Sequence, residues 1–362
     1  MKILFLCGSA EAGKDGVGDY SRRLAGELIR QGHQAQILSL CDKQAKSFVS
    51  QTQIIEETQV LVRRIPITSS FKQRLAWTRG IIKEEAPDWI SLQFVPYSFH
   101  PKGLPFWLPR FLKNLKGEHQ WQIMFHELWI GIEKSSPFKN KLIGLVQKPL
   151  IRKINNSIKP EVIHTQAKVY QHYLRKINIK ANYLSLFGNV SVTATKNRNS
   201  KQLVFVVFAT IHDNTPFENF IIDLKKELQG TDREIKFIFI GRNGDLLNSW
   251  TVILEKYSIA YELLGASSEN KISEVLLNGN YGISSTPHKI SDKSGVVAAM
   301  REHHLPIINV AKAWVDQDDI SISFNDINHF QRGTFSSNKF SETVNNSLSS
   351  VCSVFLQSIS NN

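Results

Sequence analysis

Short apolar runs alternate with amphipathic, helix-like segments along most of the 362-residue chain, and this alternation constrains the fold more than any other feature. The second half shows it most clearly. Leu203–Ala209 is a continuous run of apolar residues, rich in β-branched and aromatic side chains, as expected of a strand that is buried on both faces. Strands that alternate with helices in this way form parallel sheets covered by helices. The pattern therefore predicts an α/β protein.

The predicted elements fall into two groups. In the first group, strands are expected at Lys2–Cys7, Ala35–Cys41, Trp89–Phe94, Gln120–Phe125 and Glu161–His164, and helices from Asp19 onward and at Leu104–Lys116, Lys139–Asn155 and Lys168–Lys176. In the second group, strands are expected at Leu203–Ala209, Lys236–Ile240, Ala260–Leu264, Tyr281–Ser284 and Pro306–Val310, and helices at Phe217–Leu228, before Lys256, and at Ile272–Leu277 and Ser294–His303. Each group is long enough to bury its own hydrophobic core.

The segment Val190–Lys201 separates the two groups. It is rich in serine, threonine, asparagine and lysine and has no hydrophobic periodicity, so we place a domain boundary there. The expected domains are residues 1–192 and residues 193–338, each with a parallel sheet. Residues 339–362 contain an expected helix, Ser341–Ser358, that packs back on the N-terminal domain.

Cysteine spacing and hydropathy exclude several classes of protein. The three cysteines, Cys7, Cys41 and Cys352, are far apart and form no CxxC pair, which excludes a disulfide scaffold and a cysteine zinc site. No apolar run approaches the roughly 20 residues that a membrane helix needs. The run Ile3–Cys7 is too short for a signal peptide. We therefore expect a cytoplasmic protein.

The positive charge of the chain is concentrated in its first half. Residues 1–192 hold 28 lysines and arginines against 14 acidic residues, a net charge of +14, whereas residues 193–362 hold 16 against 18. This asymmetry favours an anionic partner for the first half, such as a phospholipid surface, a phosphorylated lipid or nucleic acid. A merely basic surface is the alternative. Because the chain has no zinc-finger spacing and no aromatic RNA-binding motif, we expect no nucleic-acid partner.

One basic stretch, residues 139–153, is also amphipathic. Five apolar residues lie among its basic residues: Leu142, Ile143, Val146, Leu150 and Ile151. This composition suits a helix that lies on a membrane, and it predicts peripheral contact with an anionic membrane, at the inner face in a cytoplasmic protein. A domain helix with a solvated basic face is the alternative.

The first predicted strand is followed by a loop that contains several glycines, Gly8–Gly18. Glycine lets a backbone approach a ligand closely, and the N-terminus of the following helix offers free amide groups. Because α/β folds bind ligands at the carboxyl ends of their strands, Gly16, Val17 and Gly18 are candidate ligand contacts. A tight turn without any ligand is the alternative.

A second candidate anion site follows the fourth strand of the second group. Lys289 and Lys293 flank a loop, and Ser294-Gly295 opens a helix whose amides and dipole favour an anion. A diphosphate would also gain from Lys293 as a point charge. Arg242, at the carboxyl end of another strand, is placed to reach the same diphosphate. Solvated lysines and a surface ion pair of Arg242 are the alternatives.

Several motifs occur in an order that is typical of one enzyme family. They are Gly16-Val17-Gly18-Asp19-Tyr20-Ser21, Gly32-His33, Leu92–Tyr97, Phe125-His126-Glu127, Phe237–Gly241 and Pro287–Pro306. In order and spacing they resemble the group 1, family 4-like retaining glycosyltransferases of the GT-B fold, and the resemblance covers most of the chain. It implies two tandem Rossmann-like domains facing across a cleft. The C-terminal domain would bind a nucleotide-sugar donor, and the N-terminal domain the acceptor.

The resemblance also implies roles for single residues. His126 corresponds to a histidine that faces the transferred sugar, so it is the expected catalytic residue, and a buried structural histidine is the alternative. Leu264 ends a strand where the family presents backbone groups to the nucleobase. The expected donor-binding residues are Gly16, Val17, Gly18, Arg242, Leu264, Lys289, Lys293, Ser294, Gly295 and Val296.

The chain departs from the family in its donor region. The family usually carries two glutamates separated by seven residues, the second followed by Ala-Met. Aligned on Ala299-Met300, these two positions hold Ile290 and Ala298. In the family, one glutamate lies near the sugar and the other holds the ribose hydroxyls.

The leading hypothesis is a retaining, hexosyltransferase-like enzyme. It would transfer a sugar from a nucleotide-sugar, expected to be a UDP-sugar such as UDP-glucose, to a lipid-linked or polysaccharide acceptor. Because the paired carboxylates are missing, the alternative is a non-catalytic or catalytically weak protein that binds a nucleotide-sugar. A nucleotide-sugar epimerase and a dinucleotide oxidoreductase using Asp42 are further alternatives. We expect no cofactor and no metal, and we interpret the triplet Asp316-Gln317-Asp318 as a solvated acidic loop.

Overall fold

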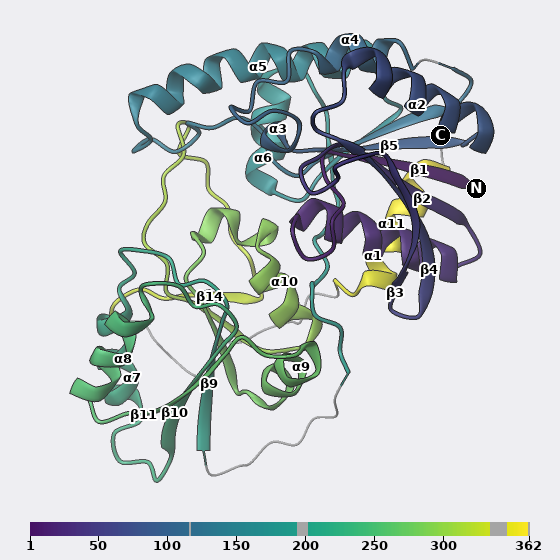
Figure 1. Cartoon of the computed structure of the whole chain (residues 1–362). Coiled ribbons are helices and arrows are strands. Elements are labelled where there is room, and N and C mark those ends of the chain that lie inside the picture. Colours follow the sequence, from purple (N-terminus) through teal and green to yellow (C-terminus); the bar gives the residue numbers. More distant parts are fainter. Residues whose placement is uncertain (116, 194–201, 334–345, 361–362) are drawn as a thin grey trace. The chain divides into compact units, whose positions relative to one another are not determined.

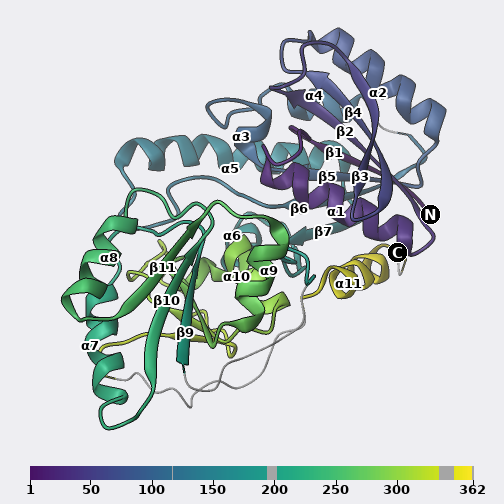
Figure 2. The same ribbon diagram turned by 60° about the horizontal axis from the view of Figure 1, so that its bottom comes forward.

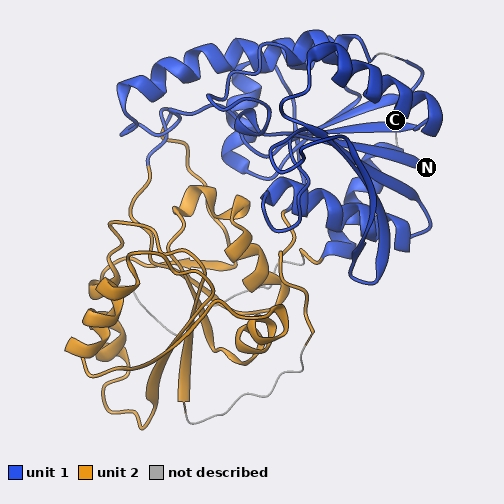
Figure 3. Ribbon diagram, in the orientation of Figure 1, with its two compact units in different colours: residues 1–185, 315–318, 348–362 blue, residues 186–314, 319–347 orange. Residues whose placement is uncertain are grey.

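The computed structural model of the chain describes residues 1–115, 117–193, 202–333 and 346–360 (Figure 1). These residues form two compact units (Figure 3). Unit 1 comprises Met1–Ser185, Val315–Asp318 and Leu348–Asn362, and unit 2 comprises Leu186–Trp314 and Asp319–Ser347. Most of the predicted linker Val190–Lys201 and the start of the helix predicted at Ser341–Ser358 lie outside the described residues.

Unit 1 is built on an eight-stranded sheet with the strand order β3-β4-β2-β1-β5-β6-β7-β8. Its strands are β1 (Lys2–Cys7), β2 (Gln34–Asp42), β3 (Val49–Ile55), β4 (Thr58–Pro66), β5 (Trp89–Phe94), β6 (Gln120–Phe125), β7 (Val162–Thr165) and β8 (Asn182–Tyr183). All pairs are parallel except β3 with β4. The central strands are buried on both faces, which explains their continuous apolar sequences.

Helices cover both faces of the unit 1 sheet (Figure 1). They are α1 (Gly16–Arg30), α2 (Phe71–Glu85), α3 (Pro96–Phe99), α4 (Leu108–Lys113), α5 (Phe138–Ile158), α6 (Lys168–Lys176) and α11 (Leu348–Ser360). Although α11 ends the chain, it packs against α1, and the ring of its Phe355 stacks on Phe5 of β1 with 6.2 Å between centroids. The C-terminal helix is therefore part of the core of unit 1.

Unit 2 is built on a six-stranded parallel sheet with the order β11-β10-β9-β12-β13-β14. Its elements are β9 (Gln202–Phe208), α7 (Phe217–Glu227), β10 (Glu234–Ile240), α8 (Leu247–Lys256), β11 (Ala260–Gly265), α9 (Glu269–Asn278), β12 (Tyr281–Ser284), the 3₁₀ helix η1 (His288–Lys293), α10 (Gly295–Glu302), β13 (Ile307–Asn309) and β14 (Ile327–His329).

Alternate residues of β9 point into two separate hydrophobic clusters on the two faces of the unit 2 sheet. On one face, Phe205 packs with Phe220 of α7 and with the side chains of α8. On the other face, Val206 packs with Leu276 of α9 and Met300 of α10. Figure 2 shows the two helix pairs on opposite sides of the strands. This is the parallel sheet with helices on both faces that the alternation predicts.

Two parts of unit 1 differ from the expectation. The antiparallel hairpin β3–β4 and helix α2 have no counterpart among the predicted elements. The helix predicted at Leu104–Lys116 is shorter, because α4 spans only Leu108–Lys113. Pro105 cannot donate a helical hydrogen bond, whereas Pro109 lies in the first turn of α4, where proline is tolerated.

Within the described ranges, no helix combines the length and the apolar character that a bilayer span requires.

Candidate functional site

The predicted contacts of the opening loop lie at the start of α1. This helix begins at Gly16, three residues earlier than expected, because Asp15 caps it. The carboxylate of Asp15 accepts hydrogen bonds from the backbone N–H groups of Val17 (3.1 Å) and Gly18 (2.8 Å). The expectation that these two amides are free is therefore wrong for this structure. A role of Gly16, Val17 and Gly18 in donor binding stays a prediction.

Close packing explains why residue 18 is a glycine. A Cβ atom at this position would lie 2.7 Å from the carbonyl oxygen of Ser9, so only glycine lets α1 approach the end of β1. Gly16, in contrast, is exposed, with no atom near its would-be Cβ. Close packing therefore explains the glycine at position 18 but not the one at position 16.

Asp42, the candidate ribose ligand of an oxidoreductase, ends β2 and is fully buried. Its carboxylate accepts hydrogen bonds from the backbone N–H groups of Ala10 (3.0 Å), Gln44 (2.9 Å) and Ala45 (3.1 Å). These bonds tie together the loops that follow β1 and β2. Because the carboxylate is already used by the backbone, the structure favours a structural role for Asp42.

The predicted catalytic residue, His126, directly follows β6 and is only 7% exposed. Its Nε2 lies 2.8 Å from Oε1 of Gln93, and its Nδ1 lies 3.1 Å from Oε1 of Gln166. The ring of Tyr20 from α1 packs edge-on against the imidazole, with 4.8 Å between centroids. Contacts from three elements therefore fix the orientation of the imidazole ring.

The contacts of His126 continue into a chain of buried polar side chains on β5, β6 and β7. Nε2 of Gln93 donates to the hydroxyl of Ser91 (2.6 Å), and that hydroxyl donates to Oε1 of Gln122. Nε2 of Gln122 lies 3.1 Å from Nδ1 of His164. Burial of polar groups is costly unless each one is hydrogen-bonded, so this chain holds Gln93, and through it His126, in one position.

The far end of the polar chain is uncharged at neutral pH. His164 is 1% exposed, and burial lowers the pKa of its imidazole to about 4. Gln93 and Gln166 were not among the predicted site residues. The sequence gives a weak signal for Gln93 only: like Ser91, it is a polar residue in the otherwise apolar strand β5.

In unit 2, hydrogen bonds connect the loops at the carboxyl edge of the sheet. The hydroxyl of Ser285, after β12, accepts from the backbone N–H of His212 (2.9 Å). The side-chain amide of Asn243, after β10, donates to the carbonyl of Ala209 (2.9 Å). The loops that follow β9, β10 and β12 therefore form one connected edge, which is where an α/β sheet binds ligands.

The predicted helix start lies at this edge. Ser294 is the N-cap of α10, and its hydroxyl accepts from the backbone N–H of Val297 (3.5 Å) and lies 3.1 Å from the hydroxyl of Thr286. The nearest atom to a Cβ at Gly295 would be 3.9 Å away, so the first turn of α10 leaves open space. Lys293 and Val296 flank this turn. The predicted cap is confirmed, while phosphate binding stays a prediction.

A cavity of about 350 Å³ opens beside η1 and the ends of β13 and β14. Its lining residues are His288, Lys289, Lys312, Ala313, Trp314, Asp319, Ile320, Ser321, Ile322 and His329. The ammonium of Lys289 lies 3.1 Å from Oδ1 of Asp319, and that of Lys312 lies 3.5 Å from Oδ1 of Asp213. The cavity thus contains two lysines, each paired with an exposed carboxylate.

The two histidines of this cavity stack on each other, with 4.6 Å between ring centroids. Burial, followed by the charge of His329, lowers the pKa of His288 to about 4, and burial also lowers the pKa of His329. Both rings are therefore neutral at pH 7, and the charged groups that line the cavity are Lys289, Lys312 and Asp319. Lys312 was not predicted, although it closely follows the predicted strand Pro306–Val310.

The remaining predicted donor residues lie along the same carboxyl edge. Arg242 is exposed just after β10. Leu264 lies near the end of β11, where its carbonyl accepts from the hydroxyl of Ser267 (3.3 Å). Ile290 lies in η1, and Ala298 is buried in α10. The structure thus places the unit 2 residues of the predicted set on one edge, whereas His126 and the opening loop belong to unit 1.

The acidic triplet differs from the expectation. Asp316 is not solvated: it is fully buried, and its Oδ2 accepts from the hydroxyl of Tyr173 (2.7 Å). Asp318 pairs with Lys176 (2.7 Å) and with Nε2 of His172 (2.6 Å). These contacts attach the segment 315–318 to unit 1. Among the side chains that the structure describes, no group of three or more His, Cys, Asp and Glu residues is arranged to hold a metal ion.

Comparisons with known proteins show which solved structures share this fold. No protein-family model matches the chain, and no curated protein matches it. Solved structures do match. A structure of Anabaena HepE in complex with UDP and glucose is 13% identical, with a TM-score of 0.53, and the match covers 99% of this chain and 91% of that one. The lipopolysaccharide outer core galactosyltransferase WaaB is 14% identical, with a TM-score of 0.52 and coverages of 100% and 91%.

Another matching structure is the UDP-GlcNAc 2-epimerase from Neisseria meningitidis bound to UDP-GlcNAc, which is 8% identical with a TM-score of 0.56. It covers 100% of both chains. Identities this low establish the fold and not the activity. The chain therefore has the GT-B fold, with two parallel-sheet α/β domains.

Proposed function

We propose that the chain is a glycosyltransferase that transfers a sugar from a UDP-sugar to a lipid-linked or polysaccharide acceptor. The observation that carries this proposal is the connected carboxyl edge of unit 2, where Lys289 and Lys312 line one cavity and α10 begins after the 3₁₀ helix that contains Lys289. Cationic side chains and the N-terminus of a helix are the groups that bind a diphosphate. A uridine nucleotide is favoured because the matched HepE structure is a complex with UDP and glucose and the matched epimerase structure is bound to UDP-GlcNAc.

In this proposal, unit 2 binds the donor and His126 of unit 1 acts on the transferred sugar. The contacts of His126 with Gln93 and Gln166 support this role, because a group that stabilises a transition state has to be held in position before the substrate arrives. Transfer with retention of configuration is part of the proposal and follows from the family resemblance alone.

Two other functions are favoured by particular observations. The family resemblance aligns Ile290 and Ala298 with two positions that hold glutamates in the family, and this favours a protein that binds a nucleotide-sugar without turning it over. The match to an epimerase favours an enzyme that needs no acceptor.

One experiment separates the three functions. The purified chain is incubated with a panel of UDP-sugars, with and without glycan or lipid-linked acceptors, and the nucleotide and sugar products are identified. Glycosyl transfer releases UDP in an acceptor-dependent manner. An epimerase converts one UDP-sugar into another without acceptor. Binding of a UDP-sugar with no product on any acceptor would indicate the non-catalytic protein, and absence of binding to every UDP-sugar would contradict the proposal.

A further inference from the structure

The outward face of α5 is apolar where a solvated surface is expected. Four side chains in its N-terminal half are exposed: Phe138 (74%), Leu142 (47%), Leu145 (59%) and Val146 (43%). Their spacing of i, i+4, i+7 and i+8 places them on one stripe along the helix, which we call the α5 stripe. Single exposed apolar residues are common on protein surfaces, but a continuous stripe indicates an interaction surface.

The inward face of α5 already accounts for the packing of this helix. A Cβ at Gly144 would clash with the carbonyl oxygen of Ile130, so the helix lies close against the preceding loop. Gln147 accepts from the backbone N–H of Ile130 (2.9 Å) and donates to the carbonyl of Gly103 (3.0 Å). Ile154 is buried on the same face. Unit 1 therefore does not need the α5 stripe for its own fold.

The charged residues of α5 are all cations. They are Lys139, Lys141, Lys148, Arg152 and Lys153, and the helix contains no aspartate or glutamate. Arg152 and Lys153 are exposed and continue the outward face beyond the α5 stripe. An apolar stripe beside cations is complementary to a bilayer with anionic headgroups, because the acyl boundary takes the apolar side chains and the headgroups attract the cations.

We propose that the outward face of α5 docks on an anionic lipid bilayer. The inference deepens the proposed function and rests on its lipid-linked acceptor, since such an acceptor is held at a bilayer surface. Figure 1 shows α5 along an outer edge of unit 1, away from the strands. The helix would lie in the plane of the interface, with Phe138, Leu142 and Leu145 inserted among the acyl chains and Arg152 and Lys153 at the phosphates.

Vesicle co-sedimentation of the full chain tests this surface. Vesicles of phosphatidylcholine alone are compared with vesicles that also contain phosphatidylglycerol, at low and high salt. We expect binding to the mixed vesicles that weakens at high salt, because salt screens exposed charges, and little binding to the neutral ones. The double variant Leu142→Ser/Leu145→Ser should bind the mixed vesicles at least about tenfold more weakly. Arg152→Gln/Lys153→Gln should lose much of the salt dependence.

The chain offers a matched control. Ile54→Ser/Val252→Ser removes two exposed apolar residues outside α5 (76% and 53% exposed) and should leave vesicle binding unchanged. Equal binding of the parent and Leu142→Ser/Leu145→Ser would overturn the proposal, as would equal binding to neutral and mixed vesicles. All substituted side chains are exposed, and circular dichroism confirms that the variants are folded.

Two other occupants of the α5 stripe give different results. If a second copy of the chain covers the stripe, light scattering detects a dimer that Leu142→Ser/Leu145→Ser dissociates. If nucleic acid binds there, an RNA oligonucleotide is retained by the parent and released by Arg152→Gln/Lys153→Gln, with no effect of the serine variant. Either result without vesicle binding overturns the proposal. Calorimetric binding of UDP is measured in parallel, so loss of the docking surface is distinguished from failure of the proposed function.

Discussion

The proposed role of His126 is tested by a single substitution. Its imidazole lies at the carboxyl end of a strand and is held by two glutamine side chains, an arrangement that fits both the proposed catalytic role and a buried structural histidine. We expect His126→Ala to lower kcat for sugar transfer by about 10- to 100-fold, the effect of losing one strong hydrogen bond in the transition state. The affinity for UDP should not change, because unit 2 is proposed to bind the nucleotide. If the variant and the parent have equal kcat, His126 has a structural role and not a catalytic one.

His164, at the other end of the polar chain, gives a prediction about stability. Its pKa is about 4 in the folded chain, against an ordinary value of about 6.5. As the pH falls from about 6.5 to about 4, His164 becomes protonated in the unfolded chain but stays neutral in the native state, so the free energy of unfolding decreases. The contribution of His164 is fully present above about pH 6.5 and is progressively lost toward about pH 4.

The variant His164→Gln keeps a polar partner for Gln122 and cannot titrate. Chemical denaturation measures the free energy of unfolding of unit 1 near neutral pH and at about pH 4.5. Between these two pH values, the free energy of unfolding should decrease by about 2 kcal/mol less in the variant than in the parent. The same pH dependence in parent and His164→Gln would show that His164 is not buried as a neutral group.

At the scale of elements, strands could be predicted well and one hairpin could not. Buried parallel strands such as β5 and β6 have continuous apolar sequences, so their bounds follow directly from the pattern. The β3–β4 turn is different. It is formed by Glu56 and Glu57, which both have positive φ (46° and 66°), whereas such turns usually contain asparagine or glycine. Tertiary contacts impose this turn, and no local sequence feature reveals it.

The same turn gives a prediction. Glu57 is exposed and adopts a left-handed backbone conformation that costs a residue with a Cβ atom about 1 kcal/mol. Glu57→Gly removes this strain, and we expect it to raise the free energy of unfolding of unit 1 by about 0.5–1 kcal/mol. Denaturant titration measures the change. The neighbouring Glu56 is not a suitable site, since its carboxylate pairs with Arg23 and Arg30. A decrease in stability would show that the turn conformation is wrong.

The candidate site could be predicted only where it depends on position along a strand. Ser294 as a helix cap and His126 at a strand end follow from local sequence, and the structure has them there. The use of Val17 and Gly18 amides by Asp15 could not be foreseen, because a capping side chain and a ligand compete for the same donors. The burial of Asp316 also could not be foreseen, because its hydrogen-bond partner Tyr173 is distant in sequence.

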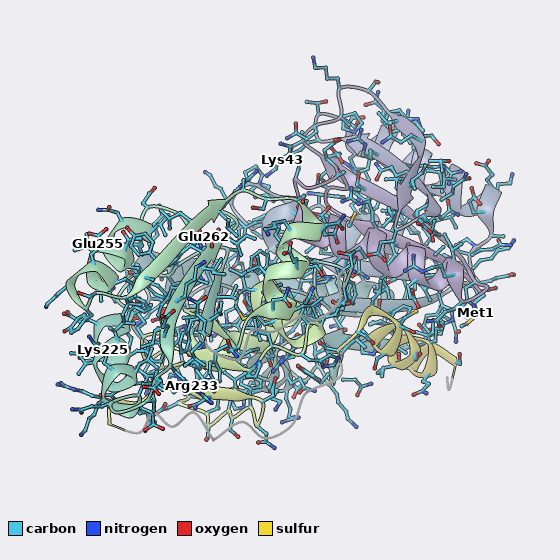
Figure 4. All side chains as sticks on the ribbon, turned by 90° about the horizontal axis from the view of Figure 1, so that it is seen from below. Met1, Lys43, Lys225, Arg233, Glu255 and Glu262 are labelled. Carbon is cyan, nitrogen blue, oxygen red and sulfur yellow. The ribbon has the colours of Figure 1, made fainter. Side chains whose placement is uncertain are left out.

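At the scale of the whole molecule, charge distinguishes the two units. The basic excess lies in residues 1–192, while the proposed donor domain is close to neutral. Figure 4 labels two basic residues of unit 2, Lys225 and Arg233, and two acidic ones, Glu255 and Glu262. A donor-binding role alone would place the excess in unit 2, where the anionic donor is proposed to bind. Its location in unit 1 instead supports an anionic acceptor environment and the docking surface on α5.

The proposed binding of a UDP-sugar by unit 2 is tested most directly by calorimetric titration of UDP into the purified chain and its variants. The account predicts saturable binding to the parent. Lys293→Ala and Arg242→Ala should each weaken binding by about 1–3 kcal/mol if the side chain makes one charge-assisted contact with the diphosphate. Lys226→Ala, which removes an exposed lysine of α7, should bind as the parent does. Absence of UDP binding, or unchanged affinity in both Lys293→Ala and Arg242→Ala, would contradict the account.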